Sequence, residues 1–179
     1  SYTIYTKASN LKSCIEVENA SKSSGANVQQ YESNGNACQH WILEETTAAG
    51  VKLDTSQVYQ FQNANSALYL EVKDASAEAG ANVQQWGANG NDCQNWTLKE
   101  FGDGYYYILS RLGDGKTYYL DVAEGKGDDG TNIQIFTNTK TSAQLFKFIP
   151  NPDGTYYIVT RASKDKGALG IAAASKEQG

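Results

Sequence analysis

The sequence predicts an all-β protein built from internal repeats, and three observations support this prediction. The 179 residues include 12 Tyr and 17 Gly but only 2 Pro, a composition typical of many short strands joined by turns. No long stretch has the hydrophobic period of a helix. Related segments follow one another along the whole chain, so the unit to explain is the repeat.

Charge and composition exclude several classes of function. The chain has 15 Lys and Arg against 20 Asp and Glu, so it offers no basic stripe for nucleic acid or anionic membranes. Its mean hydropathy is −0.55, and no apolar run approaches the roughly 18 residues of a membrane span. One His and three Cys are too few for a His-based metal site or a Ser/Cys–His hydrolase. We therefore expect no nucleic-acid partner, no membrane insertion, no metal and no cofactor.

Three segments share one spacing. In each, an acidic residue is followed 15 positions later by an aromatic residue, and 10 positions after that by a second aromatic residue. The three sets are Glu16, Tyr31 and Trp41; Glu71, Trp86 and Trp96; and Asp121, Phe136 and Phe146. All length variation falls in the connections, where loops tolerate insertions. The repeats therefore occupy about residues 1–50, 51–101 and 102–150.

Each repeat is expected to form four short strands. The first begins with Tyr, as at residues 59–61 (Tyr-Gln-Phe). The second alternates aliphatic residues with the acid, as at residues 69–72 (Tyr-Leu-Glu-Val), so the aliphatic residues should face the core and the acid the solvent. The third, at residues 82–86 (Asn-Val-Gln-Gln-Trp), places Gln84 and Trp86 on one outer face. A Ser/Gly/Asp-rich hairpin connection joins these two strands, and the fourth strand carries Gln-x-aromatic.

Together these motifs resemble the ricin-type β-trefoil lectins, which include the family 13 carbohydrate-binding modules. The resemblance covers essentially the whole chain. It implies a six-stranded barrel capped by three hairpins with pseudo-threefold symmetry, in which closure removes exposed strand edges. The predicted fold is thus a β-trefoil of three four-stranded Q-x-W repeats at residues 1–150, followed by an incomplete fourth repeat.

The resemblance also implies one shallow sugar site in each repeat. The acid accepts hydrogen bonds from vicinal hydroxyls, the outer aromatic ring stacks on the pyranose, and a neighbouring amide orients the sugar, with the closing Gln beside the site. Carried over position by position, the candidate residues are Glu16, Gln29, Tyr31 and Gln39; Glu71, Gln84, Trp86 and Gln94; and Asp121, Gln134, Phe136 and Gln144. We rank the second-repeat site first, then the first-repeat site, then the third.

The chain departs from the family pattern directly before the closing Gln. Galactose-binding members usually have Asn there, whereas this chain has Cys38, Cys93 and Ala143. That hydrogen bond is missing unless nearby Asn36 or Asn91 replaces it. Two repeats also carry Glu in place of the commoner Asp, which moves the carboxylate outward by about one methylene.

Other residues have a structural interpretation. The second aromatic residue of each repeat (Trp41, Trp96 and Phe146) is expected to pack in the core. The closing glutamines can equally be fold determinants that satisfy buried backbone groups. His40 is expected to be an exposed strand residue. Cys38 and Cys93 fit a small buried position, and a disulfide between Cys14 and Cys38, which family members often have, stays open.

Residues 151–179 begin a fourth repeat. They contain an opening strand at residues 156–158 and a second strand at residues 169–171, but Gly170 stands where the other repeats have the acid, so we expect no sugar site. Three alternatives are open: a truncated repeat array, an extra half-repeat on the outside, or a half that exchanges with the first half-repeat in the same or another chain. The connection at residues 46–57 is long enough for exchange. Truncation is the favoured alternative.

The predicted function is non-catalytic carbohydrate binding, in a module of a secreted bacterial enzyme that attacks plant polysaccharide. Residues of galactose, arabinose or xylose are the expected ligands, and the expected partners are this oligo- or polysaccharide, a catalytic domain in the parent chain and a swapped dimer. A free-standing lectin or toxin-type receptor-binding subunit is the alternative. A glycoside hydrolase needs two carboxylates around one sugar, whereas the acids recur once per repeat. A trefoil protease inhibitor needs one prominent loop, and only residues 46–57 qualify.

Overall fold

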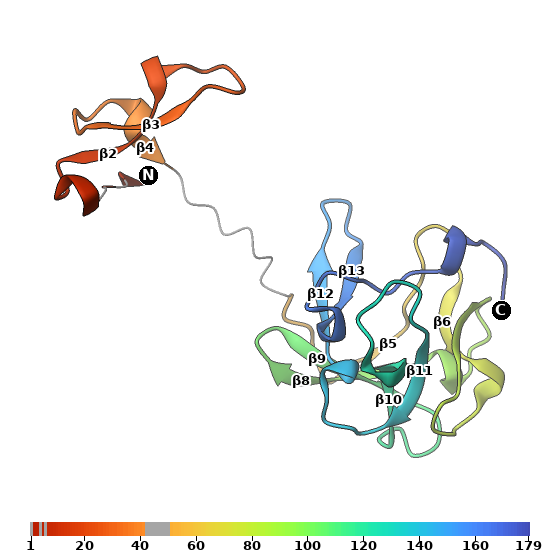
Figure 1. Cartoon of the computed structure of the whole chain (residues 1–179). Coiled ribbons are helices and arrows are strands. Elements are labelled where there is room, and N and C mark those ends of the chain that lie inside the picture. Colours follow the sequence, from red (N-terminus) through yellow and green to blue (C-terminus); the bar gives the residue numbers. More distant parts are fainter. Residues whose placement is uncertain (1, 4, 6, 42–50) are drawn as a thin grey trace. The chain divides into compact units, whose positions relative to one another are not determined.

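The computed structural model describes residues 2, 3, 5, 7–41 and 51–179. The chain divides into two compact units, Ser1–Thr47 and Ala48–Gly179, called here the N-terminal unit and the second unit (Figure 1). Residues 46–50, part of the connection expected to permit exchange, lie outside the described residues.

Strands and short 3₁₀ turns make up all the regular structure of the described residues, and no helix among them could cross a membrane. The strands of the first repeat are β1 (Tyr2–Thr3), β2 (Ser13–Val17), β3 (Val28–Glu32) and β4 (His40–Trp41). Those of the second are β5 (Val58–Tyr59), β6 (Tyr69–Val72), β7 (Val83–Trp86) and β8 (Trp96–Gly102). The third has β9 (Tyr105–Ser110), β10 (Tyr118–Val122), β11 (Ile133–Thr137) and β12 (Phe146–Pro150), and β13 (Tyr156–Thr160) follows. The all-β prediction with four strands in each complete repeat is confirmed.

The 3₁₀ turns fall at corresponding places in the repeats. They are η1 (Lys7–Ser9), η2 (Glu18–Ala20), η3 (Ala37–Gln39), η4 (Lys73–Ala75), η5 (Asp92–Gln94), η6 (Ala123–Gly125), η7 (Ser142–Gln144), η8 (Arg161–Ser163) and η9 (Ala172–Ala174). In each complete repeat one such turn follows the acid-bearing strand, and another carries the closing Gln. Both turns border the candidate sites.

The N-terminal unit is a single repeat. β1 pairs with β4 and β2 pairs with β3, both antiparallel. A single repeat offers little surface to cover its own apolar side chains. Val28 is accordingly 52% exposed, although Cys14 and Gln39 are fully buried.

The second unit is organised around β9. This strand pairs with β8, β10 and β12, and β13 and β11 extend the same sheet. β6 and β7 form a separate hairpin. All six residues of β9 are buried, because the strand is covered on both faces. Tyr106 and Ile108 point into the main core, whereas Tyr105 and Tyr107 point into a second, aromatic cluster.

The main core is formed by buried apolar side chains from the second and third repeats. They are Val72, Cys93, Trp96, Leu98, Tyr106, Ile108, Leu120, Val122, Ile135, Ala143, Phe146 and Phe148. Burial of Trp96 and Phe146 confirms their predicted packing role, and Trp41 in the N-terminal unit is partly buried. Trp41, Trp96 and Phe146 each lie on the strand that directly follows the turn with the closing Gln. The same structural elements therefore contribute to the core and to the candidate sites.

Residues 151–179 belong to the second unit. β13 pairs with β12 from Phe146 opposite Thr160 to Pro150 opposite Tyr156. The second strand predicted at residues 169–171 does not form. Only a single bridge joins Ala168 to Val159, because this half-repeat has no third strand against which a second strand could pair. The predicted grouping of residues 1–150 into one trefoil stays a prediction.

Candidate functional site

In every complete repeat, strand pairing brings the acid beside the predicted amide. Each acid lies directly opposite a Gln on the neighbouring strand, so the amide nitrogen donates to the carboxylate. The donor–acceptor distances are 3.0 Å for Gln29 and Glu16, 3.1 Å for Gln84 and Glu71, and 2.9 Å for Gln134 and Asp121. The predicted pairing of acid and amide is therefore present three times.

The three acids are buried, and the expectation that they face solvent is wrong. Glu16, Glu71 and Asp121 are only 6%, 5% and 3% exposed. The reason is that the turn carrying the closing Gln folds over the acid-bearing strand. In the second repeat, for example, Gln94 and Cys93 of η5 both contact Glu71. A buried carboxylate needs donors around it, and the closing turn supplies them.

Each closing glutamine is fully buried and ties three parts of its repeat together. Gln94 donates from Nε2 to Glu71 Oε2 at 2.9 Å and to the carbonyl oxygen of Gly87 at 2.8 Å. Its Oε1 accepts from the Asn89 backbone N–H at 3.2 Å. Gln39 makes the equivalent three contacts in the first repeat. Both Nε2 hydrogens of Gln39 and Gln94 are used within the repeat and the side chains are fully buried, so these amides hold the acid in place beside the site.

Asn89 is a site residue that the sequence reasoning missed. Its Nδ2 donates to Glu71 Oε2 at 2.6 Å, which fills the role considered for Asn91. Asn91 instead donates its backbone N–H to Asn89 Oδ1 at 2.9 Å, which orients the Asn89 side chain. The Asn-Gly-Asn turn at residues 89–91 was the available signal, but it does not say which Asn turns inward.

Cys93 lies beneath this network. Its sulfur is 3.7 Å from Glu71 Oε2. Burial raises the pKa of the Cys93 thiol, and the nearby charge of Glu71 raises it further, although the hydrogen bond with Asn89 opposes the change. The thiol is therefore held in its neutral form, consistent with the small buried position expected from sequence. Cys14, Cys38 and Cys93 are all free, so no disulfide joins Cys14 to Cys38.

The second-repeat site is a hollow of about 500 Å³. Glu71, Gln84 and Asn89 supply polar atoms, and Trp86, which is 40% exposed, supplies an aromatic wall. Glu71 Oε2 receives hydrogen bonds from Gln94 and Asn89, whereas Oε1 receives one from Gln84. Because a carboxylate oxygen has two lone pairs, Oε1 retains capacity for a further donor.

Two neighbouring segments complete the rim of this hollow. Lys73, Asp74 and Ala75 contribute from η4, and Gly179 contributes from residues distant in sequence. Asp74 and Ala75 have φ of 54° and 50°, the left-handed conformation that turns the chain sharply after β6. The hairpin connection predicted from composition is thus itself part of the site.

The other two sites share this plan with different aromatic residues. Tyr31 is 52% exposed, whereas Phe136 is partly buried. Burial raises the pKa of Asp121, although hydrogen bonds from Gln134 and Gln144 oppose the shift. Gln144 also donates to the carbonyl oxygen of Thr137 at 2.8 Å. The third site therefore has a less accessible ring, and its carboxyl group holds a proton more tightly than an ordinary Asp does.

The structure also places His40 and Gly170, two residues outside the three sites for which the sequence made predictions. His40 is exposed on β4, as expected. Gly170 occupies the position of the acid in residues 151–179 and is exposed, without a carboxylate. Within residues 7–41 and 51–179, no group of His, Cys, Asp and Glu side chains is arranged to hold a metal ion.

Comparisons with known proteins agree with this architecture. A family model described as ricin-type β-trefoil lectin domain-like matches residues 1–57, 51–136 and 113–179. The structure of ThreeFoil, a designed threefold-symmetric protein, is 33% identical, with a TM-score of 0.64 over 68% of this chain and 84% of that chain. The lectin of Polyporus squamosus is 15% identical, with a TM-score of 0.54 over 71% of this chain and 49% of its own, a likeness of fold alone.

One curated relative aligns over a shorter stretch. The clotting factor G alpha subunit of Tachypleus tridentatus is 36% identical over 69 residues, which are 37% of this chain and 10% of that protein. The chain thus matches only a small part of that relative's length.

The fold and the repeated sites define a lectin-type β-trefoil that binds carbohydrate. The family match extends along the whole sequence, and the chain belongs to the ricin-type β-trefoil lectin domain-like family. Domains of this family are generally non-catalytic binding modules.

Proposed function

We propose that the chain binds neutral sugar residues of a plant polysaccharide through its three repeat sites, with galactose, arabinose or xylose as the recognised residues. The observation that carries the proposal is the second-repeat site, where Glu71 lies beside the exposed ring of Trp86. A sugar presents hydroxyl donors at its edge and C–H groups on its face. The carboxylate accepts from the hydroxyls, and the ring packs against the C–H face.

Preorganisation supports this assignment. Glu71 is held by Gln84, Gln94 and Asn89, so a sugar meets a carboxylate that needs no reorientation on binding. The hollow is shallow, and we expect each site to bind weakly, with a dissociation constant on the order of tens of micromolar to millimolar. Several such sites on one chain raise the affinity for a polymer through effective concentration.

The wider role in this proposal is that of a secreted targeting module attached to a glycoside hydrolase. The match to a short stretch of a much longer protein supports a modular use of these repeats. Weak sites suit this role because they hold an enzyme near its substrate while allowing it to move. Catalysis would belong to the partner domain, since each repeat contributes one acid.

The test is affinity electrophoresis and calorimetry with β-galactan, arabinogalactan and xylan. Trp86→Ala removes the stacking surface, and Glu71→Gln removes the charged acceptor while keeping the shape of the side chain. Phe101→Ala is the control, because Phe101 is 48% exposed but lies outside the repeat sites. We expect both site variants to lower retardation and the control to leave it unchanged.

Unchanged binding by the double variant Trp86→Ala/Glu71→Gln, with circular dichroism showing an intact fold, would overturn the assignment of the second-repeat site. Equivalent single variants Tyr31→Ala and Phe136→Ala rank the other two sites. Release of reducing sugars from the same polysaccharides by the purified chain would contradict a purely binding role.

A further inference from the structure

The chain contains two Asn-Gly pairs, and both lie in a turn that closes a candidate site. Asn34-Gly35 precedes the closing Gln of the first repeat, and Asn89-Gly90 precedes that of the second. Asparagine is a thermolabile residue. It loses its side-chain amide most easily before Gly, which has no Cβ to hinder the approach of its own backbone nitrogen. The two turns are therefore candidate sites of spontaneous deamidation.

This reaction needs only water. The backbone nitrogen of Gly90 attacks Cγ of Asn89 and forms a C–N bond, and the side-chain nitrogen takes up the displaced proton and leaves as ammonia. Water then opens the resulting succinimide ring at either carbonyl group, which yields aspartate or isoaspartate at residue 89. The balance is one water consumed and one ammonia released, without an oxidant or a reductant.

The attacking nitrogen is accessible in both turns. Among the described residues, neither the Gly35 N–H nor the Gly90 N–H donates a backbone hydrogen bond. No atom outside the adjoining residues lies within 4 Å of the position that a Cβ would take at either glycine. Asn34 and Asn89 are both exposed. Solvent therefore reaches both pairs, and no neighbouring segment covers them.

The two asparagines differ in one contact. In each, Oδ1 accepts from the backbone N–H two residues later, at 3.0 Å for Asn34 and 2.9 Å for Asn89. Nδ2 of Asn89 also donates to Glu71 Oε2 at 2.6 Å, whereas Glu16 in the first repeat receives its amide donors from Gln29 and Gln39. A carboxylate gives no proton to a leaving nitrogen, and this short bond must break before ammonia leaves. The contact with Glu71 therefore slows the reaction at Asn89.

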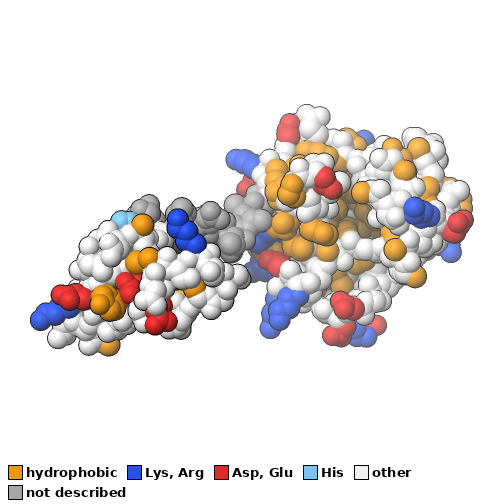
Figure 2. All heavy atoms as spheres, turned by 90° about the horizontal axis from the view of Figure 1, so that it is seen from above, with side chains coloured by type: hydrophobic (Ala, Val, Ile, Leu, Met, Phe, Trp, Pro, Cys, Tyr) orange, Lys and Arg blue, Asp and Glu red, His pale blue; other side chains and the backbone are white. Residues whose placement is uncertain are grey.

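Deamidation would reverse the role of residue 89 in the second-repeat site. The product carries a carboxylate where a donor now lies 2.6 Å from Glu71, and two like charges this close repel each other. Isoaspartate also adds a carbon to the backbone and displaces the side chain. On the face shown in Figure 2, charged side chains are scattered among uncharged groups, and one more carboxylate there changes little. Residue 89 differs because it faces a buried acid.

We propose that Asn89-Gly90 is a modification site at which spontaneous deamidation inactivates the second-repeat site, and that the hydrogen bond to Glu71 delays this reaction. The loss of sugar binding rests on the proposed function, whereas the reaction itself does not. The third repeat has Thr139 and Lys140 at the corresponding positions, so its closing turn has no Asn-Gly pair. Ageing therefore shifts binding from the second-repeat site to the third.

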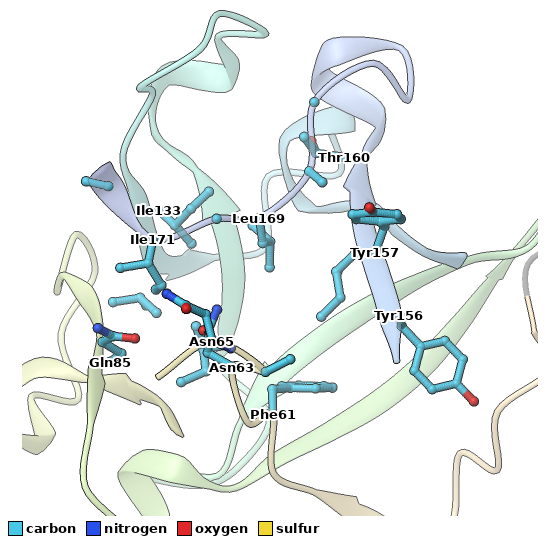
Figure 3. Close-up of a pocket in the computed structure, with 18 of the residues that line it drawn as sticks. Phe61, Asn63, Asn65, Gln85, Ile133, Tyr156, Tyr157, Thr160, Leu169 and Ile171 are labelled. Atoms are coloured by element: carbon cyan, nitrogen blue, oxygen red, sulfur yellow. The ribbon is translucent and has the colours of Figure 1, made fainter. Parts of the chain in front are cut away.

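The first test is peptide mass spectrometry of the full chain, incubated at neutral pH and sampled over weeks for aspartate and isoaspartate. We expect conversion at Asn34 and Asn89, with Asn89 about tenfold slower because one charge-assisted hydrogen bond must break first. Asn63 and Asn65, which line the pocket in Figure 3, are internal controls because neither precedes a Gly. Both should stay intact over the same period. Conversion at Asn89 as fast as at Asn34 would overturn the proposal.

Three variants separate this chemistry from a general loosening of the turn. Glu71→Ala removes the acceptor and should raise the rate at Asn89 about tenfold. Its control is Gln84→Ala, which removes a different partner of Glu71 and should leave that rate unchanged. Gly90→Ala should suppress conversion, and Ala75 shows that alanine adopts the left-handed conformation in this fold. Conversion that Gly90→Ala does not slow would contradict the proposed reaction. The comparison of the two wild-type pairs does not depend on the folding of any variant.

The effect on binding is measured by affinity electrophoresis of fresh and aged chains. In a Tyr31→Ala/Phe136→Ala background, which leaves only the second-repeat site, retardation should fall as residue 89 is converted. The same chain with Gly90→Ala should keep its retardation. Binding that persists after conversion would overturn the proposal.

A readout without sugar tests the repulsion from Glu71. Asn89→Asp should lower the urea midpoint at neutral pH more than Asn91→Asp does. Asn91 is the matched control because it contacts Asn89 through its backbone N–H. Equal midpoints would contradict the proposed inactivation. If the fresh chain binds no polysaccharide, the proposed function fails, and the conversion rates and midpoints still decide this proposal.

Discussion

The side-chain amide of Gln94 donates to the carboxylate of Glu71 at 2.9 Å, across 23 positions of sequence. This contact joins the turn that ends the second-repeat site to the strand that carries its acid. Because both side chains are buried, it links the stability of the repeat to the geometry of the site. The first repeat has the same relationship between Gln39 and Glu16.

Replacing Gln94 should destabilise the second unit. Gln94→Leu removes two donors and one acceptor from a buried site. Glu71 loses one of its three amide donors, and the Gly87 carbonyl oxygen and the Asn89 N–H lose the partner that Gln94 provides. We expect a loss of about 3–5 kcal/mol in the free energy of unfolding, measured by urea denaturation. Gln62→Leu is the control, because Gln62 is exposed. A loss no larger than that of the control would contradict the role assigned to the closing Gln.

Asn89 and Asn91 should differ sharply on substitution. Asn89→Ala removes a 2.6 Å hydrogen bond to Glu71, and we expect a stability loss of about 1–2 kcal/mol together with weaker sugar binding. Asn91→Ala leaves the backbone N–H that orients Asn89 in place, so binding should change little. Calorimetric titration of both variants makes the comparison, and equal losses of affinity would argue against Asn89 as the orienting amide.

Ala75 offers a route to a more stable protein. Its φ of 50° is strained for a residue with a Cβ, and Gly125 occupies the equivalent position in the third repeat with φ 65°. The left-handed conformation costs a non-glycine residue about 1–2 kcal/mol, and the added flexibility of Gly in the unfolded chain offsets about 0.4–1 kcal/mol of the gain. Ala75→Gly should therefore raise the free energy of unfolding by up to about 1.6 kcal/mol. Thermal and urea denaturation measure the change, and a destabilised variant contradicts the strain argument.

The buried Asp121 carboxyl group should make stability depend on pH. Burial raises its pKa in the folded state, against opposing hydrogen bonds from Gln134 and Gln144. The folded protein then holds this proton more tightly than the unfolded chain, whose pKa is about 3.9. The stabilisation that protonated Asp121 gives to the folded state is fully present below the pKa of the unfolded chain. It is lost as pH rises through the pKa of the folded state.

Asp121→Asn removes that ionisation while keeping an oxygen that can accept from Gln134. We expect the stability of the wild type relative to this variant to increase as pH falls from neutral towards about 3. Urea denaturation at a series of pH values gives the difference directly. A difference that stays constant with pH would show that Asp121 titrates alike in the folded and unfolded states.

Tyr105 attaches residues 151–179 to the rest of the second unit. Its hydroxyl donates to the Asp165 carboxylate, with both oxygens 2.7 Å away. Since Asp165 is partly exposed, Tyr105→Phe should cost about 1–2 kcal/mol in the free energy of unfolding. Tyr157→Phe is the control, because Tyr157 is 59% exposed. Equal stability of the two variants would contradict an anchoring role for this contact.

Tyr105 should also make the stability of the folded protein decrease at alkaline pH. Burial raises the pKa of Tyr105, and the hydrogen bond and charge of Asp165 raise it further. The stabilisation is therefore present below the unfolded pKa of about 10 and is lost as pH rises through the folded pKa. Unfolding measured at increasing alkaline pH should show a loss in the wild type that is smaller in Tyr105→Phe.

Much of the candidate site follows from spacing. The period of two and the constant interval between motifs predicted that Glu71 and Gln84 would lie on paired strands, and the structure places them directly opposite each other. The same pattern could not predict that the acid is buried. Alternation defines the two faces of a hairpin, but a later turn decides which face is covered. It likewise could not distinguish Asn89 from Asn91, because the direction of each side chain depends on the backbone angles of one turn.

The sequence by itself determined the repeats, the four strands of each complete repeat and the positions of acid, amide and outer aromatic residue. These depend on local backbone geometry, which spacing along the chain expresses directly. Only the tertiary structure decided that the acids are buried and that residues 151–179 pair with the third repeat. Those outcomes depend on contacts between segments that are far apart in the sequence, such as Gln94 with Glu71 and Asp165 with Tyr105. The spacing of motifs along the chain does not specify such contacts.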